Sequence, residues 1–355
     1  MKKIKGFSNK FLFLAVALLI VIKIIFFVAI KIGFISLGLG GGNDSDYYHF
    51  YAIGYYDFAV NTWPVILRYL NDIGLYSREA LSVVLLILNL CFIPLLAAKL
   101  SGLSFRKNQK YFLTIILICL IYPTLFIYTF DVYRDVFMVF SFLVGCLIVK
   151  KCLNSSNYIN FLLLFLISLL IGFFLLGLRP YLGYAFLLAL FLWKIRFTKK
   201  RLVFLAILYF SALFLVNYLG YLDFLTEYRS GFEEVGGGST LGLNFSNPVL
   251  FIPNFILSTL GQLFGLYITN PLAVILLLIE TLPFFFMFLY VLKEIKLADS
   301  FVRFLIIFFV LYGSVWLIGN DNLGTAVRLR IYNYLAIYIS FFYILRTKRL
   351  LLKEL

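Results

Sequence analysis

The chain has 355 residues, of which 63% are hydrophobic and 13% are charged, and its mean hydropathy is +1.02. A soluble domain of this length could not hide so much apolar surface, because too much of it would remain in contact with water. The formal net charge is +15. Because the basic residues stand in short loops between apolar runs, we read this charge as a topology signal and expect no nucleic-acid partner.

Ten apolar runs predict membrane-spanning helices, although several are shorter than the usual length of about 20 residues. The first follows the basic N-terminus, and we interpret it as a retained helix because it is too long for the core of a signal peptide and lacks a cleavage motif. We therefore predict a single all-α integral membrane domain over residues 1–355. The runs cover residues 11–32, 79–100, 111–130, 136–150, 158–177, 181–195, 202–220, 271–292, 302–319 and 331–346.

The charges predict the orientation of these spans. With the N-terminus inside, most of the 31 basic residues fall on inside segments and both termini lie inside, as the positive-inside rule requires. Most of the 16 acidic residues then face outward, which that rule does not demand. The outward excess of acids has two explanations, a functional site or plain solvation of the outer loops.

Outward basic residues are almost all arginine, whereas lysine is the commoner basic residue inside. A planar guanidinium binds a diphosphate better than an ammonium does, because it offers parallel N–H donors. We therefore expect a phosphate-binding site on the outer face. The outward arginines are Arg68, Arg78, Arg134, Arg179, Arg229, Arg328 and Arg330.

Two outer segments, 33–78 and 221–270, are long, and long loops between packed elements are often functional. We expect them to form the site region. In the first, a glycine-rich run at 38–42 leads to Asp44, Asp46 and His49, the only histidine. The carboxylates of Asp44 and Asp46, two positions apart in the sequence, could bind a divalent metal with pyrophosphate or accept a proton from a hydroxyl. The alternative is an Asp-rich turn that caps a helix beginning near residue 47.

Residues 55–77 mix aromatic, apolar and charged side chains, which predicts an interfacial helix on the outer leaflet. The later segment 226–248 combines Arg229 with glutamates and a Gly-Gly-Gly-Ser-Thr run. It lacks the lysine of a nucleotide-binding P-loop and suits either a lid over a substrate groove or a plain disordered loop.

Short outer turns carry the remaining charges. Charges at such a depth are costly unless they pair or line a cavity, so each is either an internal ion pair or a ligand-binding group. Glu280 is the one clear acid within a span, and Pro283 near it could leave a backbone carbonyl open. The other charges in turns are Asp131, Arg134, Asp135, Arg179, Asp321, Arg328 and Arg330.

Three stretches carry a resemblance to known families. The first span followed by an outer Asp44-x-Asp46-Tyr47-Tyr48 resembles membrane glycosyltransferases of the GT-C type. Tyr122-Pro123 through Arg134-Asp135-Val136-Phe137 resembles the short charged hairpin of such proteins. The closing GTAVRLR at 324–330 is similar to segments of bacterial O-antigen and capsule polymerases of the Wzy class.

The resemblance implies a multi-pass GT-C-like protein of the bacterial inner membrane that polymerises undecaprenyl-diphosphate-linked oligosaccharides on its periplasmic face, in lipopolysaccharide or capsule synthesis. Membrane lipids and a chain-length regulator would be further partners. Polymerases of this class are described as arginine-driven and metal-free, which implies no cofactor, although Asp44 and Asp46 could hold a divalent metal. It implies catalytic roles for Asp44, Asp46 and His49, diphosphate binding by Arg134, Arg179, Arg229, Arg328 and Arg330, and support from Asp131, Asp135 and Glu280.

Three alternatives stay open at this point. A GT-C enzyme that adds a single sugar from a polyprenyl-phosphate donor would have the same outer charges. A flippase or transporter of lipid-linked oligosaccharide would favour charged residues along several spans, and only Lys23 and Glu280 lie there. An acyltransferase would need a catalytic histidine, for which His49 is the only candidate.

Overall fold

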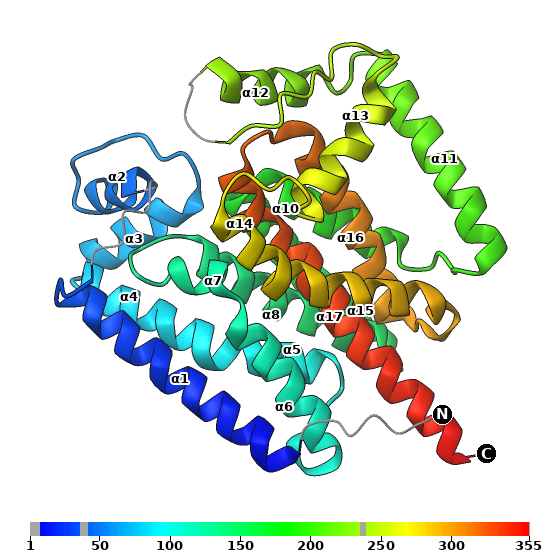
Figure 1. Ribbon diagram of the computed structural model, residues 1–355, viewed down its shortest axis with the longest axis horizontal. Coiled ribbons are helices and arrows are strands. Elements are labelled where there is room, and N and C mark those ends of the chain that lie inside the picture. Colours follow the sequence, from blue (N-terminus) through cyan, green and yellow to red (C-terminus); the bar gives the residue numbers. More distant parts are fainter. Residues whose placement is uncertain (1–7, 36–41, 235–238, 355) are drawn as a thin grey trace. The chain divides into compact units, whose positions relative to one another are not determined.

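The computed structural model describes residues 8–35, 42–234 and 239–354 (Figure 1). It is 78% helical, and the part of the chain described contains no strand. A single isolated bridge joins Thr240 to Asn322. The prediction of an all-α protein is confirmed.

The chain forms two compact units, Met1–Gly183 and Tyr184–Leu355, and each is described by itself. Helix α10 (Pro180–Leu192) begins at the end of the first unit. The first unit contains α1 (Asn9–Lys31), α2 (Gly42–Ala52), α3 (Thr62–Asp72), α4 (Arg78–Ile87), η1 (Leu88–Phe92), α5 (Ile93–Leu100), α6 (Phe105–Ile121), α7 (Pro123–Ile127), α8 (Asp135–Leu153) and α9 (Tyr158–Leu178). The second contains α11 (Lys199–Tyr218), α12 (Asp223–Glu234), α13 (Phe251–Ser258), η2 (Thr259–Leu263), α14 (Pro271–Leu276), η3 (Leu277–Thr281), α15 (Leu282–Lys293), η4 (Ile295–Leu297), α16 (Ser300–Gly319) and α17 (Leu323–Glu354).

Seven helices in the described residues are long and apolar enough to cross a membrane. They coincide with seven of the ten predicted spans, so the chain is a polytopic membrane protein. The number of ten, the GT-C architecture and the inside position of both termini stay predictions. The seven helices are Asn9–Lys31, Arg78–Leu100, Asp135–Leu153, Tyr158–Leu178, Lys200–Tyr218, Pro271–Lys293 and Ser300–Gly319.

The other three predicted spans fall on helices of different lengths. The 13-residue α10 covers only residues 181–192 of the span predicted at 181–195, and the 32-residue α17 covers the span predicted at 331–346. The span predicted at 111–130 is wrong as a single helix, because α6 ends at Ile121 and the shorter α7 follows. The cause is Pro123, which forces the preceding Tyr122 out of the helical region, to φ −57° and ψ 104°.

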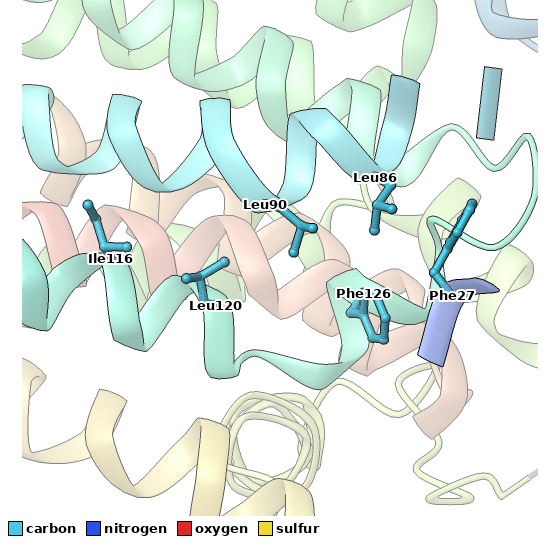
Figure 2. Close-up of a cluster of buried hydrophobic side chains, with 6 residues drawn as sticks. All are labelled: Phe27, Leu86, Leu90, Ile116, Leu120 and Phe126. Atoms are coloured by element: carbon cyan, nitrogen blue, oxygen red, sulfur yellow. The ribbon is translucent and has the colours of Figure 1, made fainter. Parts of the chain in front are cut away.

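A cluster of buried apolar side chains holds α1, α4, η1, α6 and α7 together in the first unit (Figure 2). Since lipid tails are as apolar as these side chains, close packing rather than removal from water stabilises such a cluster within a membrane. Lys23 lies on the same side of α1, with its ammonium 4.4 Å from the centroid of the Phe126 ring. The cluster consists of Phe27, Leu86, Leu90, Ile116, Leu120 and Phe126.

The long outer segment of the first unit folds into α2 and α3, which pack against each other. Helix α3 begins where the side chain of Asn61 accepts a hydrogen bond from the Trp63 backbone N–H at 2.9 Å. It lies within residues 55–77, where a helix was predicted, and its position at the membrane surface stays a prediction. Helix α3 also approaches α9 at Gly177, where an added Cβ atom would collide with the Thr62 hydroxyl oxygen.

In the second unit, α16 and α17 pack along each other, and α17 also packs on α15. The Trp316 indole N–H donates to the Asn333 side chain at 3.0 Å, and the rings of Phe284 and Tyr334 stack with centroids 4.0 Å apart. The long outer segment of this unit forms α12, α13 and η2. The glycines at 38–41 and 236–238, and with them the predicted lid tip, lie outside the described residues.

Removing one side chain from the apolar cluster tests whether packing supports the first unit. Leu120 is fully buried, so Leu120→Ala leaves a cavity that the neighbours fill only in part. We expect a loss of about 2 kcal/mol in stability, measured as faster thermal inactivation of the purified protein in detergent. Leu170→Ala is the matched control, because Leu170 is 69% exposed toward the lipid. Equal losses in both variants would contradict the packing argument.

Cysteine labelling tests the predicted orientation. Asp57 lies on an outer segment in this orientation, and Lys107 lies on an inside segment. We expect Asp57→Cys to react with a membrane-impermeant maleimide in intact cells, and Lys107→Cys only after permeabilisation. The natural cysteines can be replaced first, since the structure gives them no disulfide. The reverse labelling pattern would overturn the orientation.

Candidate functional site

Asp44 and Asp46 both lie near the start of α2, which begins at Gly42 rather than near residue 47. Since a helix turns about 100° per residue, side chains two positions apart point to nearly opposite sides. The two carboxylates therefore face different neighbours, and this geometry does not favour one ion held by both. Within the described residues, no group of three or more His, Cys, Asp or Glu side chains is placed to hold a metal ion.

Asp46 belongs to a cluster with Arg78 and Asp131. Arg78 follows Ser77, the cap of α4, and its guanidinium binds Asp131 through both carboxylate oxygens, at 2.7 and 2.5 Å. The Nη2 atom of Arg78, which takes part in the bond to Asp131, also donates to Asp46 at 2.6 Å. One arginine thus connects the first turns of α2, the start of α4 and the turn before α8.

The environment of Asp131 favours its charged form. Partial burial by itself raises the pKa of this carboxyl, but hydrogen bonds from the Arg78 guanidinium, the Val132 backbone N–H and Ser45 outweigh burial. The pKa of Asp131 therefore lies below its usual value. Val132 also accepts, through its carbonyl, a hydrogen bond of 2.8 Å from the Trp63 indole, which fixes the turn against α3.

His49 forms a second link between α2 and the segment before α4. Its Nδ1 lies 2.9 Å from the Tyr76 hydroxyl, and the two rings stack with centroids 5.8 Å apart. Burial raises the pKa of Tyr76 to about 12, so the phenol keeps its proton at neutral pH. The only histidine of the chain is therefore oriented by a neutral phenol.

Deeper in the first unit, the start of α8 meets the end of α9. Asp135 pairs with Arg179 at 3.9 Å, and both side chains are about 95% buried. Next to this pair, Arg134 Nη1 donates to the Leu178 carbonyl at 3.2 Å. The Nε atom of Arg134 is buried and has no hydrogen-bond partner among the described residues. A buried donor without a partner is costly, so this arginine has the capacity to bind one more acceptor.

Tyr48 connects these groups to α2. It is 3% exposed, and burial raises the pKa of its phenol, while Arg134 lowers it and Asp44 and Asp135 raise it. Tyr48 therefore lies within electrostatic reach of one arginine and two carboxylates. The structure thus brings the sequence-predicted residues of the first unit into one region.

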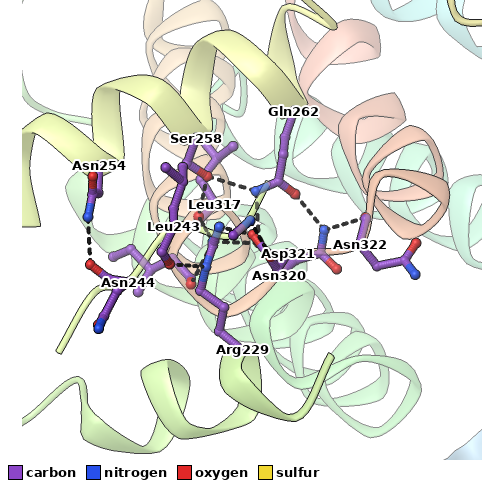
Figure 3. A network of polar contacts seen from close by, with 12 residues as sticks. Arg229, Leu243, Asn244, Asn254, Ser258, Gln262, Leu317, Asn320, Asp321 and Asn322 are labelled. Atoms are coloured by element: carbon purple, nitrogen blue, oxygen red, sulfur yellow. Dashed lines mark hydrogen bonds and ion pairs between the residues drawn. The ribbon is translucent and has the colours of Figure 1, made fainter. Parts of the chain in front are cut away.

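In the second unit, Arg229 anchors α12 to the loop before α17 (Figure 3). Its guanidinium pairs with Asp321, and the other carboxylate oxygen of Asp321 accepts from the Gly242 N–H at 3.0 Å. The remaining donors of Arg229 bond to four backbone carbonyls, those of Leu243, Leu317, Ile318 and Asn320. Gln262 extends the network from η2 to Asn320. In this structure Arg229 bonds to protein through all its donor nitrogens, and its predicted diphosphate role stays a prediction.

Glu280 pairs with Arg330 at 2.7 Å, and both side chains are buried. Glu280 lies in η3, and its carbonyl accepts a hydrogen bond from the Tyr338 hydroxyl at 3.1 Å. Gly265 lies against the pair with φ +59°, and a Cβ there would be 2.9 Å from Arg330 Nη1. The neighbouring Arg328, which is partly exposed, lies two residues away and therefore on a different face of α17.

Sequence reasoning missed Arg78 and Tyr76 as members of the first-unit cluster. Arg78 was one of the outward arginines, so the arginine excess outside was the signal that could have found it. Tyr76 carries no such signal, because 25 tyrosines are spread over the chain. The predicted residues Arg229, Glu280, Arg328 and Arg330 belong to the second unit.

No family model, curated protein or solved structure matches this chain. The function is therefore argued from the residues and their geometry.

The Arg78–Asp131 pair predicts a loss of stability in acid. The pKa of Asp131 is lower in the folded state than in the unfolded chain. The stability that its ionised carboxylate contributes is therefore complete above the unfolded-chain pKa of about 3.9, and it is lost as the pH falls through the folded-state pKa. We expect thermal inactivation of the purified protein to accelerate as the pH falls from about 4 toward 3. Asp131→Asn should flatten this dependence. The control Asp57→Asn, at an exposed aspartate, should leave it unchanged; an unchanged profile in Asp131→Asn would contradict the assignment.

Proposed function

We propose that this protein is a membrane glycosyltransferase that polymerises undecaprenyl-diphosphate-linked oligosaccharide repeat units on the outer face of the bacterial inner membrane. Three features support the proposal. The chain is a polytopic membrane protein, so its substrates can reach it through the lipid. Its outward basic residues are almost all arginines, and its outer segments resemble those of GT-C transferases and Wzy-class polymerases.

The observation that carries the proposal is the set of groups around Tyr48. Arg134 has a buried Nε donor without a hydrogen-bond partner among the described residues, and a diphosphate oxygen would satisfy it. Asp44 and Arg134 both interact electrostatically with the Tyr48 phenol. A proton acceptor and an anion-binding donor thus lie near one side chain, which is the combination that glycosyl transfer from a diphosphate needs.

In the proposed reaction, a hydroxyl oxygen of the acceptor glycan attacks the anomeric carbon of the donor glycan. The new glycosidic bond forms as the bond between that carbon and the lipid diphosphate breaks. The hydroxyl proton passes to a carboxylate, and the diphosphate leaves with the electron pair. Arg134 would stabilise the negative charge that grows on this leaving group.

Among the carboxylates of α2, we assign the proton acceptor to Asp44. One oxygen of Asp46 is already bound by Arg78, which suits Asp46 to positioning α2 instead. Arg179, in the same unit as Arg134, would contribute further positive charge toward the diphosphate. The diphosphate role of Arg328, which belongs to the second unit, stays a prediction. Arg229 and Arg330 have structural partners in Asp321 and Glu280, and we propose that their main role is to hold the second unit together.

Three variants in the natural host test the proposal. Arg134→Ala should reduce chain growth by about 100-fold or more, as expected for loss of a donor to a developing anion. Arg134→Lys should restore only part of it, because an ammonium lacks the guanidinium geometry. Asp44→Asn should abolish long chains. The measurement is the ladder of glycan lengths on a gel, together with accumulation of the lipid-linked repeat.

Arg68→Ala is the matched control, since Arg68 is an outward arginine bound to the exposed Asp57 and should not affect the ladder. All variants should insert at normal levels, which immunoblotting of membranes checks. A normal ladder in both Arg134→Ala and Asp44→Asn would overturn the proposal. Transfer of one sugar from a polyprenyl phosphate, or movement of lipid-linked sugar across vesicles without elongation, would replace it with a single-sugar transferase or a transporter.

A further inference from the structure

A cavity of about 300 Å³ lies between α12 and the segment Gly242–Ser246, in the outer part of the second unit. This volume is at the lower end of the range of about 300 to 1,000 Å³ that small-molecule sites occupy. It is large enough for one or two sugar rings and too small for a long lipid chain. The lining residues are Thr226, Glu227, Arg229, Ser230, Gly242, Leu243, Asn244, Phe245 and Ser246.

We propose that this cavity binds one or two sugar units of the oligosaccharide substrate. The inference rests on the proposed function, because it names the part of the protein that recognises the glycan. Its evidence is separate, however, since none of the residues to which we assign chemistry or diphosphate binding lines the cavity.

The chemistry of the lining fits a neutral, hydroxyl-rich ligand. Thr226, Ser230 and Ser246 donate their hydroxyl protons to protein oxygens and so offer oxygen lone pairs to ligand hydroxyls. Asn244 adds an amide N–H donor and Glu227 a carboxylate. A carboxylate accepts hydrogen bonds from two neighbouring hydroxyls, as it does from the two nitrogens of arginine. Leu243 adds apolar surface for the C–H face of a sugar ring, while Phe245 is buried under the Arg229 guanidinium and closes that part of the wall.

The charge of the lining disfavours a phosphate. The one cation of the cavity wall, Arg229, is neutralised by Asp321 and is bonded to four carbonyls. Glu227 is exposed and contributes a carboxylate to the cavity wall. An anionic ligand would meet this carboxylate without a compensating cation, whereas a glycan would meet an acceptor for its hydroxyls.

The cavity walls are fixed before any ligand binds. Arg229 holds α12, while Asp321 binds the Gly242 N–H and so holds the opposite wall. Asn254 of α13 donates to the Asn244 carbonyl at 2.5 Å, and the Asn244 side chain accepts from the Ser246 N–H at 2.8 Å. A site built in this way loses little entropy on binding, which favours recognition of a flexible oligosaccharide.

The test uses the full-length protein in nanodiscs and a defined probe. The probe is the saccharide released by mild acid from lipid-linked intermediates that accumulate in cells lacking this gene. We expect it to bind the natural protein, measured by saturation-transfer NMR and calorimetry. Glu227→Gln should weaken binding by about tenfold, because it removes the charged acceptor. Thr226→Val, which preserves the shape of the cavity, should weaken binding to a smaller degree, and Ser230→Trp should fill the cavity and abolish binding.

Asp223→Asn is the matched control, because Asp223 is an exposed acid on the same helix outside the cavity. It should bind like the natural protein. If the saccharide accumulates but Glu227→Gln and Ser230→Trp bind it normally, this inference is wrong while the polymerase proposal survives. If no lipid-linked saccharide accumulates in cells lacking the gene, the polymerase proposal is wrong. The present inference, which rests on that proposal, is then wrong as well.

Discussion

The neutralisation of buried arginines by carboxylates is the interaction on which both units depend. A charge placed among apolar helices is costly unless an opposite charge and hydrogen bonds compensate for it. Asp135–Arg179 in the first unit, and Arg229–Asp321 and Glu280–Arg330 in the second, are buried pairs of this kind. Each joins elements that are distant in sequence, so removing one partner would leave a buried charge and loosen two elements at once.

The buried arginines differ in how many of their donors bond to the protein. This difference distinguishes an arginine with a structural role from one that can bind a ligand. Arg229 directs its donors to one carboxylate and four carbonyls, which makes it an anchor for α12. Arg134 binds one carbonyl and keeps a buried donor that no described residue satisfies. A buried donor without a hydrogen-bond partner is a place where a ligand can supply the missing interaction. This contrast is the reason for assigning leaving-group stabilisation to Arg134.

Polar contacts add to apolar packing in ordering the helices α2, α3 and α12. Helix α2 is connected to the start of α4 by Asp46–Arg78 and by His49–Tyr76, and α12 is fixed by Arg229. Such contacts hold side chains in defined positions outside the apolar core, which suits groups that must meet a polar substrate. They also depend on the ionisation of their carboxylates. The geometry of the Asp46–Arg78–Asp131 cluster is thus coupled to pH, whereas the packed apolar cluster around Leu120 is not.

The sequence by itself determined that the chain is an all-α polytopic membrane protein, because long apolar runs have few alternatives in lipid. Seven predicted spans became helices with boundaries within a few residues, and the error at 111–130 came from Pro123, which broke a run that composition alone made continuous. Composition also singled out the outward arginines. Only the tertiary structure decided which carboxylate each arginine meets, since Arg78 and Asp131 are 53 residues apart and Arg229 and Asp321 are 92 apart. Such pairings depend on how helices pack, and no local pattern encodes them. The structure therefore separated Arg134 from Arg229, two residues that looked alike in the sequence.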